Sequence, residues 1–259
     1  AGQTGFSALG DVLAGKTNPS GKTSDTFLKD LATSVSYNNF GKFEYTNMAD
    51  KAAKYKGFTG DDITAIPAFV NYSEGIYVGY KYYETRYEDT VLGQGNAASA
   101  VGATSLADGG WTYADEVQFP FGYGLSYTTF EQALEKADKD RDDTFTFEVK
   151  VTNTGETAGK DVVQIYAQSP YTEYDRANGV EKASVQLVGF AKTETLQPGE
   201  SQTVTIQVDQ EELKSYDASA NGGEGSYILE AGDYYFTAAA DSHAAVNNIL
   251  AAKGAEGMD

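Results

Sequence analysis

The sequence contains no cysteine and a single histidine, His243. Without cysteine there can be no disulfide, no thiol nucleophile and no cysteine-ligated zinc site. One histidine leaves little material for a serine–histidine triad or a multi-histidine metal site. Any hydrolytic reaction catalysed by this chain would therefore have to use carboxylates as its catalytic groups.

Long apolar runs and positive charge are also scarce. No run approaches the roughly 18 apolar residues that a membrane-spanning helix needs. The chain has 38 acidic and 19 basic residues, a formal net charge of −19. An acidic surface repels phosphate groups, so neither nucleic acid nor an anionic membrane is expected as a partner, whereas a neutral sugar carries no such penalty.

The second half of the sequence predicts a β-sandwich. In residues 143–153, Phe145, Phe147, Val149 and Val151 alternate with polar residues, which places four apolar side chains on one face of a strand. Further strands are expected over 127–130, 162–167, 185–191 and 204–208, and as a hairpin of 227–229 with 234–236. About seven strands within some 110 residues is typical of an immunoglobulin-like domain.

The first 127 residues have little sustained periodicity. Residues 4–14 predict one helix, with Phe6, Leu9 and Leu13 on a single stripe and Gly15 as its stop. Long stretches rich in Gly, Asn, Ser and Tyr follow. Since such long loops are unusual within a compact domain, we expect a loop-rich, incomplete α/β segment whose sheet belongs to sequence upstream of Ala1. The fold class is thus mainly β, a sandwich preceded by this segment.

Three stretches carry a family resemblance. Residues 11–22 end in Asn18-Pro19-Ser20-Gly21-Lys22, residues 72–84 read YSEGIYVGYKYYE, and residues 119–130 read FPFGYGLSYTTF. They resemble, in this order, motifs of the bacterial β-glycosidases of glycoside hydrolase family 3. The sequence departs from the family pattern at Thr23-Ser24, where leucine and proline are usual, and at Lys81, where arginine is usual.

The resemblance implies a domain plan and an activity. Residues 1–127 would be the C-terminal part of the family's α/β sandwich domain, 128–240 a fibronectin type III-like domain, and 241–259 a linker or short terminal helix. The parent would be a retaining exo-β-glycosidase, β-glucosidase-like, that acts on oligosaccharides or aryl glycosides without a cofactor. Its remaining α/β sandwich and TIM-type barrel portions would be the partners of this chain. The alternative is a non-catalytic carbohydrate-binding or structural β-sandwich module.

No catalytic carboxylate pair can be assigned. Retaining glycosidases use a nucleophile and an acid/base about 5 Å apart. The family's nucleophilic aspartate lies in an S-D-W stretch, and the only tryptophan here is Trp111, preceded by Gly110. Asp25, in Ser24-Asp25-Thr26, is interpreted as a turn residue, and the family's acid/base glutamate would lie upstream. This chain alone is therefore predicted to be inactive.

The substrate-proximal candidates lie in the second stretch. Glu74 stands among tyrosines, where burial would raise its pKa and make it a useful acid; the alternative is that it fixes a loop. Tyr72 and Tyr77 could stack on sugar rings. The run Tyr80-Lys81-Tyr82-Tyr83 is more typical of a domain interface.

Overall fold

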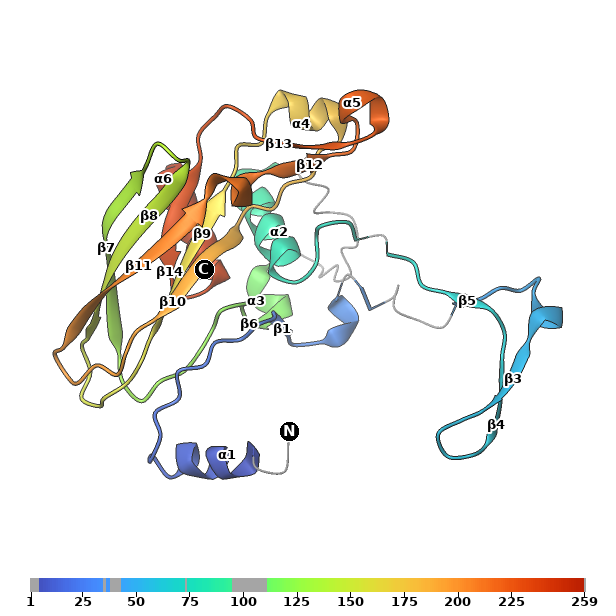
Figure 1. Ribbon diagram of the computed structural model, residues 1–259, viewed down its shortest axis with the longest axis horizontal. Helices are drawn as coiled ribbons and strands as arrows, with labels where there is room; N and C mark the ends of the chain where they lie inside the picture. Colours follow the sequence, from blue (N-terminus) through green and yellow to red (C-terminus); the bar gives the residue numbers. More distant parts are fainter. Residues whose placement is uncertain (1–4, 35, 38–42, 73, 95–110, 259) are drawn as a thin grey trace.

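The computed structural model describes residues 5–34, 36–37, 43–72, 74–94 and 111–258 (Figure 1). Its second half is the predicted β-sandwich. One antiparallel sheet has the order β11–β8–β7, with β7 at Phe130–Lys139, β8 at Thr144–Asn153 and β11 at Ser201–Asp209. The other has the order β10–β9–β14, with β9 at Val162–Gln168, β10 at Gln186–Lys192 and β14 at Tyr235–Ala239.

The alternation in β8 builds the core between the two sheets. Phe147, Val149 and Val151 are buried and Phe145 is partly buried, as the period of two predicts. Apolar side chains of β9 and β11 meet them in one cluster, which also contains Val163, Ile165, Leu196, Val204, Ile206 and Val208.

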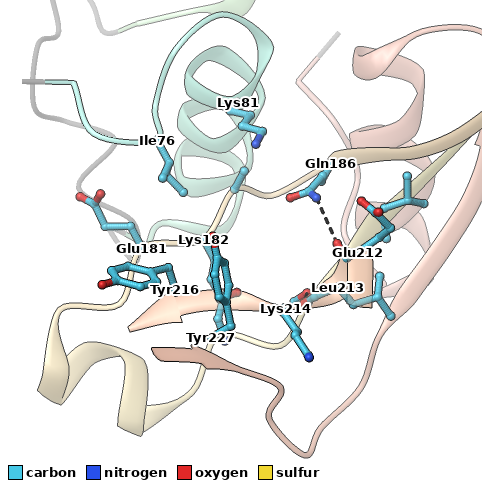
Figure 2. Close-up of a pocket in the computed structure, with 15 residues that line it drawn as sticks. Ile76, Lys81, Glu181, Lys182, Gln186, Glu212, Leu213, Lys214, Tyr216 and Tyr227 are labelled. Carbon is cyan, nitrogen blue, oxygen red and sulfur yellow. Dashed lines mark hydrogen bonds between the residues drawn. The ribbon is translucent and has the colours of Figure 1, made fainter. Parts of the chain in front are cut away.

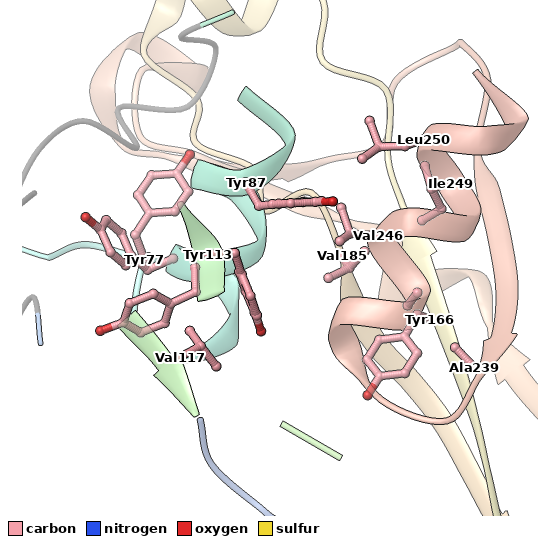
Figure 3. Close-up of a cluster of buried hydrophobic side chains, with 13 residues drawn as sticks. Tyr77, Tyr87, Tyr113, Val117, Tyr166, Val185, Ala239, Val246, Ile249 and Leu250 are labelled. Atoms are coloured by element: carbon pink, nitrogen blue, oxygen red, sulfur yellow. The ribbon is translucent and has the colours of Figure 1, made fainter. Parts of the chain in front are cut away.

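Strand β9 is buried on both of its faces. Val163 and Ile165 point into the core of the sandwich, whereas Tyr166 belongs to a second cluster on the outer face of the sheet. Two helices build that second cluster: α2 (Tyr80–Leu92) and α6 (Ser242–Ala252). Figure 3 shows tyrosines from the first half of the chain gathered opposite Tyr166, Val185 and the apolar side of α6. The sandwich is thus covered on one side by helices.

Helix α2 was not predicted, because its sequence has no amphipathic pattern. Eight consecutive residues, 82–89, are buried, and they include Glu84, Arg86, Glu88 and Asp89. A helix that is enclosed on every side does not need one apolar stripe. Glu84, Arg86 and Glu88 are instead each paired with groups from other segments of the chain, a feature that periodicity cannot reveal.

The predicted hairpin of 227–229 with 234–236 is wrong. Strand β13 (Ser226–Ile228) pairs with β12 (Ser215–Asp217), and β14 pairs with β9. The segment between β13 and β14 is held in place by the side chain of Glu230. Its carboxylate accepts hydrogen bonds from Lys182 Nζ and, at 2.7 Å, from Thr172 Oγ1. The chain therefore crosses from the β12–β13 ribbon to the edge of β9 instead of turning back.

The first half has only short strand pairs among its described residues. These pairs are β1 (Phe27–Leu28) with β6 (Val117–Phe119), β2 (Phe43–Glu44) with β5 (Ala68–Phe69), and β3 (Ala53–Lys56) with β4 (Asp62–Ala65). Short helical turns join them at η1 (Leu31–Thr33), η2 (Ala49–Lys51) and α3 (Tyr113–Glu116). Figure 1 shows the β3–β4 hairpin standing away from the sandwich.

Helix α1 spans Gly5–Leu13, close to the predicted 4–14, and Gly15 follows it with a φ of +70°. Its apolar stripe lies open: Phe6, Leu9 and Leu13 are all exposed in the part of the chain that the structure describes. An apolar helix face of this kind normally packs against another element. The expectation that its covering sheet lies in another part of the protein stays a prediction.

Candidate functional site

Two of the three signature stretches meet on the sandwich. The side chain of Asn18 accepts hydrogen bonds from the backbone N–H of Tyr127, at 2.8 Å, and from Ser126 Oγ, at 3.0 Å, and it donates to the Ala158 carbonyl at 3.0 Å. Thr23 N–H donates to the Tyr123 carbonyl at 2.7 Å. The first stretch is therefore fixed to the loop that leads into the fibronectin-like half.

The glycines of the FPFGYG stretch allow it to pack closely on both β9 and the first stretch. Gly122 has a φ of +84°, and a Cβ there would lie 2.2 Å from Gln164 Oε1. A Cβ at Gly124 would lie 2.4 Å from the backbone oxygen of Gly21. A side chain at Gly122 would displace this stretch from β9, and one at Gly124 would displace it from the first stretch.

The second stretch is a loop of the same kind, which leads into α2. Gly75 has a φ of +61°, and a Cβ there would lie 2.7 Å from Glu181 Oε2. Gly79 caps α2 with a φ of +58° and a ψ of −137°, a conformation that only glycine adopts readily. The Tyr77 N–H closes the turn on the Glu74 carbonyl at 3.1 Å.

The three substrate-proximal candidates occupy different environments on this loop. Tyr77 is buried, and its hydroxyl donates to the Lys182 carbonyl at 3.2 Å. Burial, reinforced by the negative charge of Glu181, raises the pKa of Tyr77 far above its ordinary value, so the hydroxyl stays protonated. Glu74 is partly buried and Tyr72 is 82% exposed. Tyr77 thus holds the loop, and Tyr72 presents an open aromatic ring.

Glu84 is the centre of a buried polar cluster beneath this loop. It is fully buried, and its Oε1 accepts hydrogen bonds from Tyr113 Oη at 2.7 Å and from Ser242 Oγ at 2.8 Å. Its Oε2 lies 2.8 Å from Nδ1 of His243, whose ring stacks on Tyr113 at 3.7 Å. The carboxylate joins α2, α3 and α6, and this arrangement makes His243 a structural partner of Glu84.

Two further charges of α2 are paired in the same way. Arg86 forms a buried ion pair with Glu116 at 3.2 Å, and its guanidinium lies 4.4 Å from the ring centroid of Trp111. Two residues later, Glu88 accepts from Gln168 Nε2 at 2.9 Å and pairs with Lys253 at 2.6 Å. Charged groups of α2 therefore bind it to α3 through Glu84 and Arg86, and to β9 and the end of α6 through Glu88.

An open cavity of about 330 Å³ lies beside this loop; we call it the tyrosine cavity (Figure 2). Ile76 and Lys81 contribute from the loop and from α2, and Lys214, Tyr216 and Tyr227 contribute from the opposite wall. The wall between them includes Glu181, Lys182, Gln186 and Glu212. The volume of the cavity is within the range of small-ligand sites.

The β12–β13 ribbon that lines this cavity is anchored through Asp217 of β12. Asp217 is buried and accepts hydrogen bonds from Tyr174 Oη at 2.6 Å and Ser219 Oγ at 2.7 Å. These two hydroxyls hold the pKa of Asp217 below its ordinary value. Tyr174 belongs to α4 (Glu173–Asn178), so the ribbon is fixed to that helix.

A buried lysine holds α4 in turn. Lys182 Nζ pairs with Asp175 Oδ2 at 2.9 Å and with Glu230, and it donates to the Pro170 carbonyl at 2.8 Å. These three acceptors use the donors of the ammonium group. Lys182 thus lines the cavity, while its ammonium group is paired with Asp175 and Glu230.

Neither a metal site nor a membrane-spanning helix is found in the described ranges. No group of three or more His, Asp or Glu side chains there could hold a metal ion. No helix there has both the length and the apolar character to cross a bilayer. Asp25 accepts from the N–H of Thr26 at 2.8 Å, which agrees with its interpretation as a turn residue.

Comparison with known proteins identifies the sandwich. A family model of the fibronectin type III-like domain matches residues 161–242. The chain is 35% identical over 249 residues to β-glucosidase A of Butyrivibrio fibrisolvens, a match that covers 91% of this chain and 24% of that protein. A β-glucosidase of Ruminococcus albus is 34% identical over 245 residues, covering 94% of this chain and 20% of its own length.

A solved structure agrees over the same range. β-Glucosidase 3B of Thermotoga neapolitana, in complex with α-D-glucose, has a TM-score of 0.65 and 30% sequence identity, covering 94% of this chain and 26% of that one. The chain therefore carries a fibronectin type III-like domain. Its relation to the β-glucosidases of glycoside hydrolase family 3, predicted from the three motifs, is confirmed. It spans 20–26% of the length of these relatives.

Proposed function

We propose that this chain is part of a retaining exo-β-glycosidase, a bacterial β-glucosidase-type enzyme of carbohydrate metabolism. Its role is to supply the accessory sandwich and to brace loops near the active site. The proposed division is the C-terminal part of an α/β sandwich domain (1–127), the fibronectin type III-like domain (128–240) and a linker or short terminal helix (241–259). The nucleophile and the acid/base belong to portions of the enzyme outside this chain.

The fixed second signature loop is the observation that carries this proposal. The Tyr77 hydroxyl is bound to the Lys182 carbonyl, and a side chain at Gly75 would collide with Glu181, so the loop lies close against the segment that precedes β10. Tyr72 remains exposed on the same loop. A rigid support with an open aromatic ring is suited to lining one wall of a sugar site. We propose Tyr72 and Glu74 as the substrate-proximal residues and Tyr77 as their positioning residue.

Activity of the isolated chain is the first test. The 259-residue chain, incubated with 4-nitrophenyl β-glucoside, should release no nitrophenol. A longer protein, in which the chain is joined to the barrel and sandwich portions of a family 3 relative, should release it. Turnover by the chain alone would show that the carboxylate pair lies within it and would contradict the proposal.

The role of Tyr72 is tested in the longer protein. Tyr72→Ala should lower kcat/KM by about tenfold, the order of effect expected when one aromatic contact to a sugar ring is lost. Tyr55→Ala, on the β3–β4 hairpin, is the matched control because Tyr55 is 52% exposed and lies on a different segment. Equal effects of the two substitutions would remove Tyr72 from the site.

The alternative, a non-catalytic carbohydrate-binding module, is favoured by one observation of its own. The tyrosine cavity opens on the β12–β13 ribbon and carries two exposed aromatic rings. The two functions are compatible within one enzyme.

A further inference from the structure

The tyrosine cavity has an aromatic wall that is built and held in place. Tyr216 and Tyr227 are direct cross-strand partners, and their rings pack edge-on with centroids 5.4 Å apart. Both remain exposed, at 53% and 68%. Gly225 allows this arrangement, because its φ is +82° and a Cβ there would lie 2.0 Å from Tyr216 Oη. Tyrosines that are positioned but uncovered offer rings and hydroxyls to a ligand.

The rest of the cavity lining carries polar groups without protein partners. Among the described residues, Lys81 Nζ and the carboxylate of Glu181 have neither a hydrogen bond nor an ion pair, and the same holds for the carboxylate of Glu212. Burial lowers the pKa of Lys81, and ammonium groups in such surroundings are ordinarily paired. Gln186 donates to the Glu212 carbonyl at 3.1 Å, which leaves its own amide oxygen available. Figure 2 shows Lys81 across the cavity from Lys214 and Tyr227.

These features select the chemistry of a ligand. The unpaired ionic groups are one ammonium and two carboxylates, so the cavity has no excess of positive charge to hold an anion. Hydroxyl groups can donate to carboxylates and accept from an ammonium, and the C–H face of a sugar ring packs on an aromatic ring. A neutral ring that bears several hydroxyls satisfies both walls.

We propose that the tyrosine cavity is a non-catalytic binding site for a neutral sugar ring of an oligosaccharide, stacked on Tyr216 and Tyr227 and hydrogen-bonded by Lys81. The site lies between α2 and the β12–β13 ribbon and uses residues from both halves of the chain. We expect the oligosaccharide to be built of β-linked glucose, and this expectation depends on the proposed function. The existence of the site is inferred from the residues that line the cavity alone.

The test is a calorimetric titration of the 259-residue chain with cellotetraose. Saturable binding is expected, and Tyr227→Ala and Tyr216→Ala should each weaken it by about five- to tenfold. Lys81→Met, which keeps the apolar stem and removes the ammonium, should weaken it by a similar factor. Tyr55→Ala is the matched control and should bind as the unmodified chain does. Urea-unfolding midpoints close to that of the unmodified chain exclude unfolding as the cause of any loss.

Xylotetraose and maltotetraose separate the site from the sugar assignment. Binding of one of these in place of cellotetraose, weakened by Tyr227→Ala, would support the site and contradict the β-glucosidase-type specificity. No saturable binding of any of the three would overturn the site. Equal binding by Tyr227→Ala and Tyr55→Ala would overturn it as well.

Discussion

Replacing Glu84 should have a large effect on stability. The carboxylate is fully buried, and its oxygens lie within 2.8 Å of Tyr113 Oη, Ser242 Oγ and His243 Nδ1. Glu84→Ala leaves these three groups buried without their acceptor. Removing one member of a buried charged cluster costs about 3–5 kcal/mol. With an m-value of about 2–3 kcal/mol per molar urea, the unfolding midpoint should fall by about 1–2.5 M.

Glu84→Gln separates the loss of charge from the loss of the acceptor. The amide oxygen can still accept from Tyr113 and Ser242, and the amide NH₂ can donate to a neutral imidazole of His243, so the cost should be only about 1–2 kcal/mol.

Urea titration followed by tryptophan fluorescence is the appropriate assay. Trp111 is the only tryptophan, and its ring lies 6.4 Å from that of Tyr113, so it reports on this cluster. Glu131→Ala, at an exposed position of β7, provides the baseline. A loss for Glu84→Ala no greater than for Glu131→Ala would show that this carboxylate does not hold α2, α3 and α6 together.

Three further predictions follow from other contacts. Gly75→Ala should destabilise the chain by about 1–3 kcal/mol, since it adds a positive-φ penalty to the clash with Glu181, and Glu181→Ala should restore part of the loss in a double-mutant cycle. Lys182→Met should cost about 3–5 kcal/mol by urea unfolding, because two carboxylates lose their cation, and a cost below 1 kcal/mol would contradict the ion pairing. The pKa of Asp217 is depressed in the folded state, so its stabilising effect is present above the ordinary aspartate pKa of about 3.9 and is lost as the pH falls through the lower folded value. Asp217→Asn should therefore lower the unfolding midpoint at pH 7 and have a progressively smaller effect towards pH 3, and a constant difference between the two proteins would refute the assignment.

The sandwich was predictable because its strands follow local rules. The alternation from Phe145 to Val151 gave β8 its correct extent and its buried face. The partners of β13, which contains Tyr227, and of β14, which contains Tyr235, were not predictable in the same way. Turn residues between two strands do not reveal that each strand pairs with another strand elsewhere. Strand existence is a local property, whereas strand pairing depends on the whole sheet.

The site was predictable only where glycines mark it. Gly75 and Gly79 lie in a recognisable motif, and their positive φ angles explain why glycine stands there. The charges of α2 gave no such signal, because charged residues such as Glu84, Arg86 and Glu88 are usually solvent-exposed. Their burial depends on partners 29 to 165 positions away in the sequence, which no window of residues contains.

The position of α2 also determines which segment can be moved as a unit between proteins. The outer face of the β10–β9–β14 sheet is covered by α2, which precedes the matched region, and by α6, nearly all of which follows it. A segment cut to residues 128–240 would bring Tyr166 and Val185 to the surface and leave Gln168 without its Glu88 acceptor. A gene rearrangement that transfers this sandwich to another enzyme should therefore include both helices. The smallest transferable unit is the sandwich together with α2 and α6.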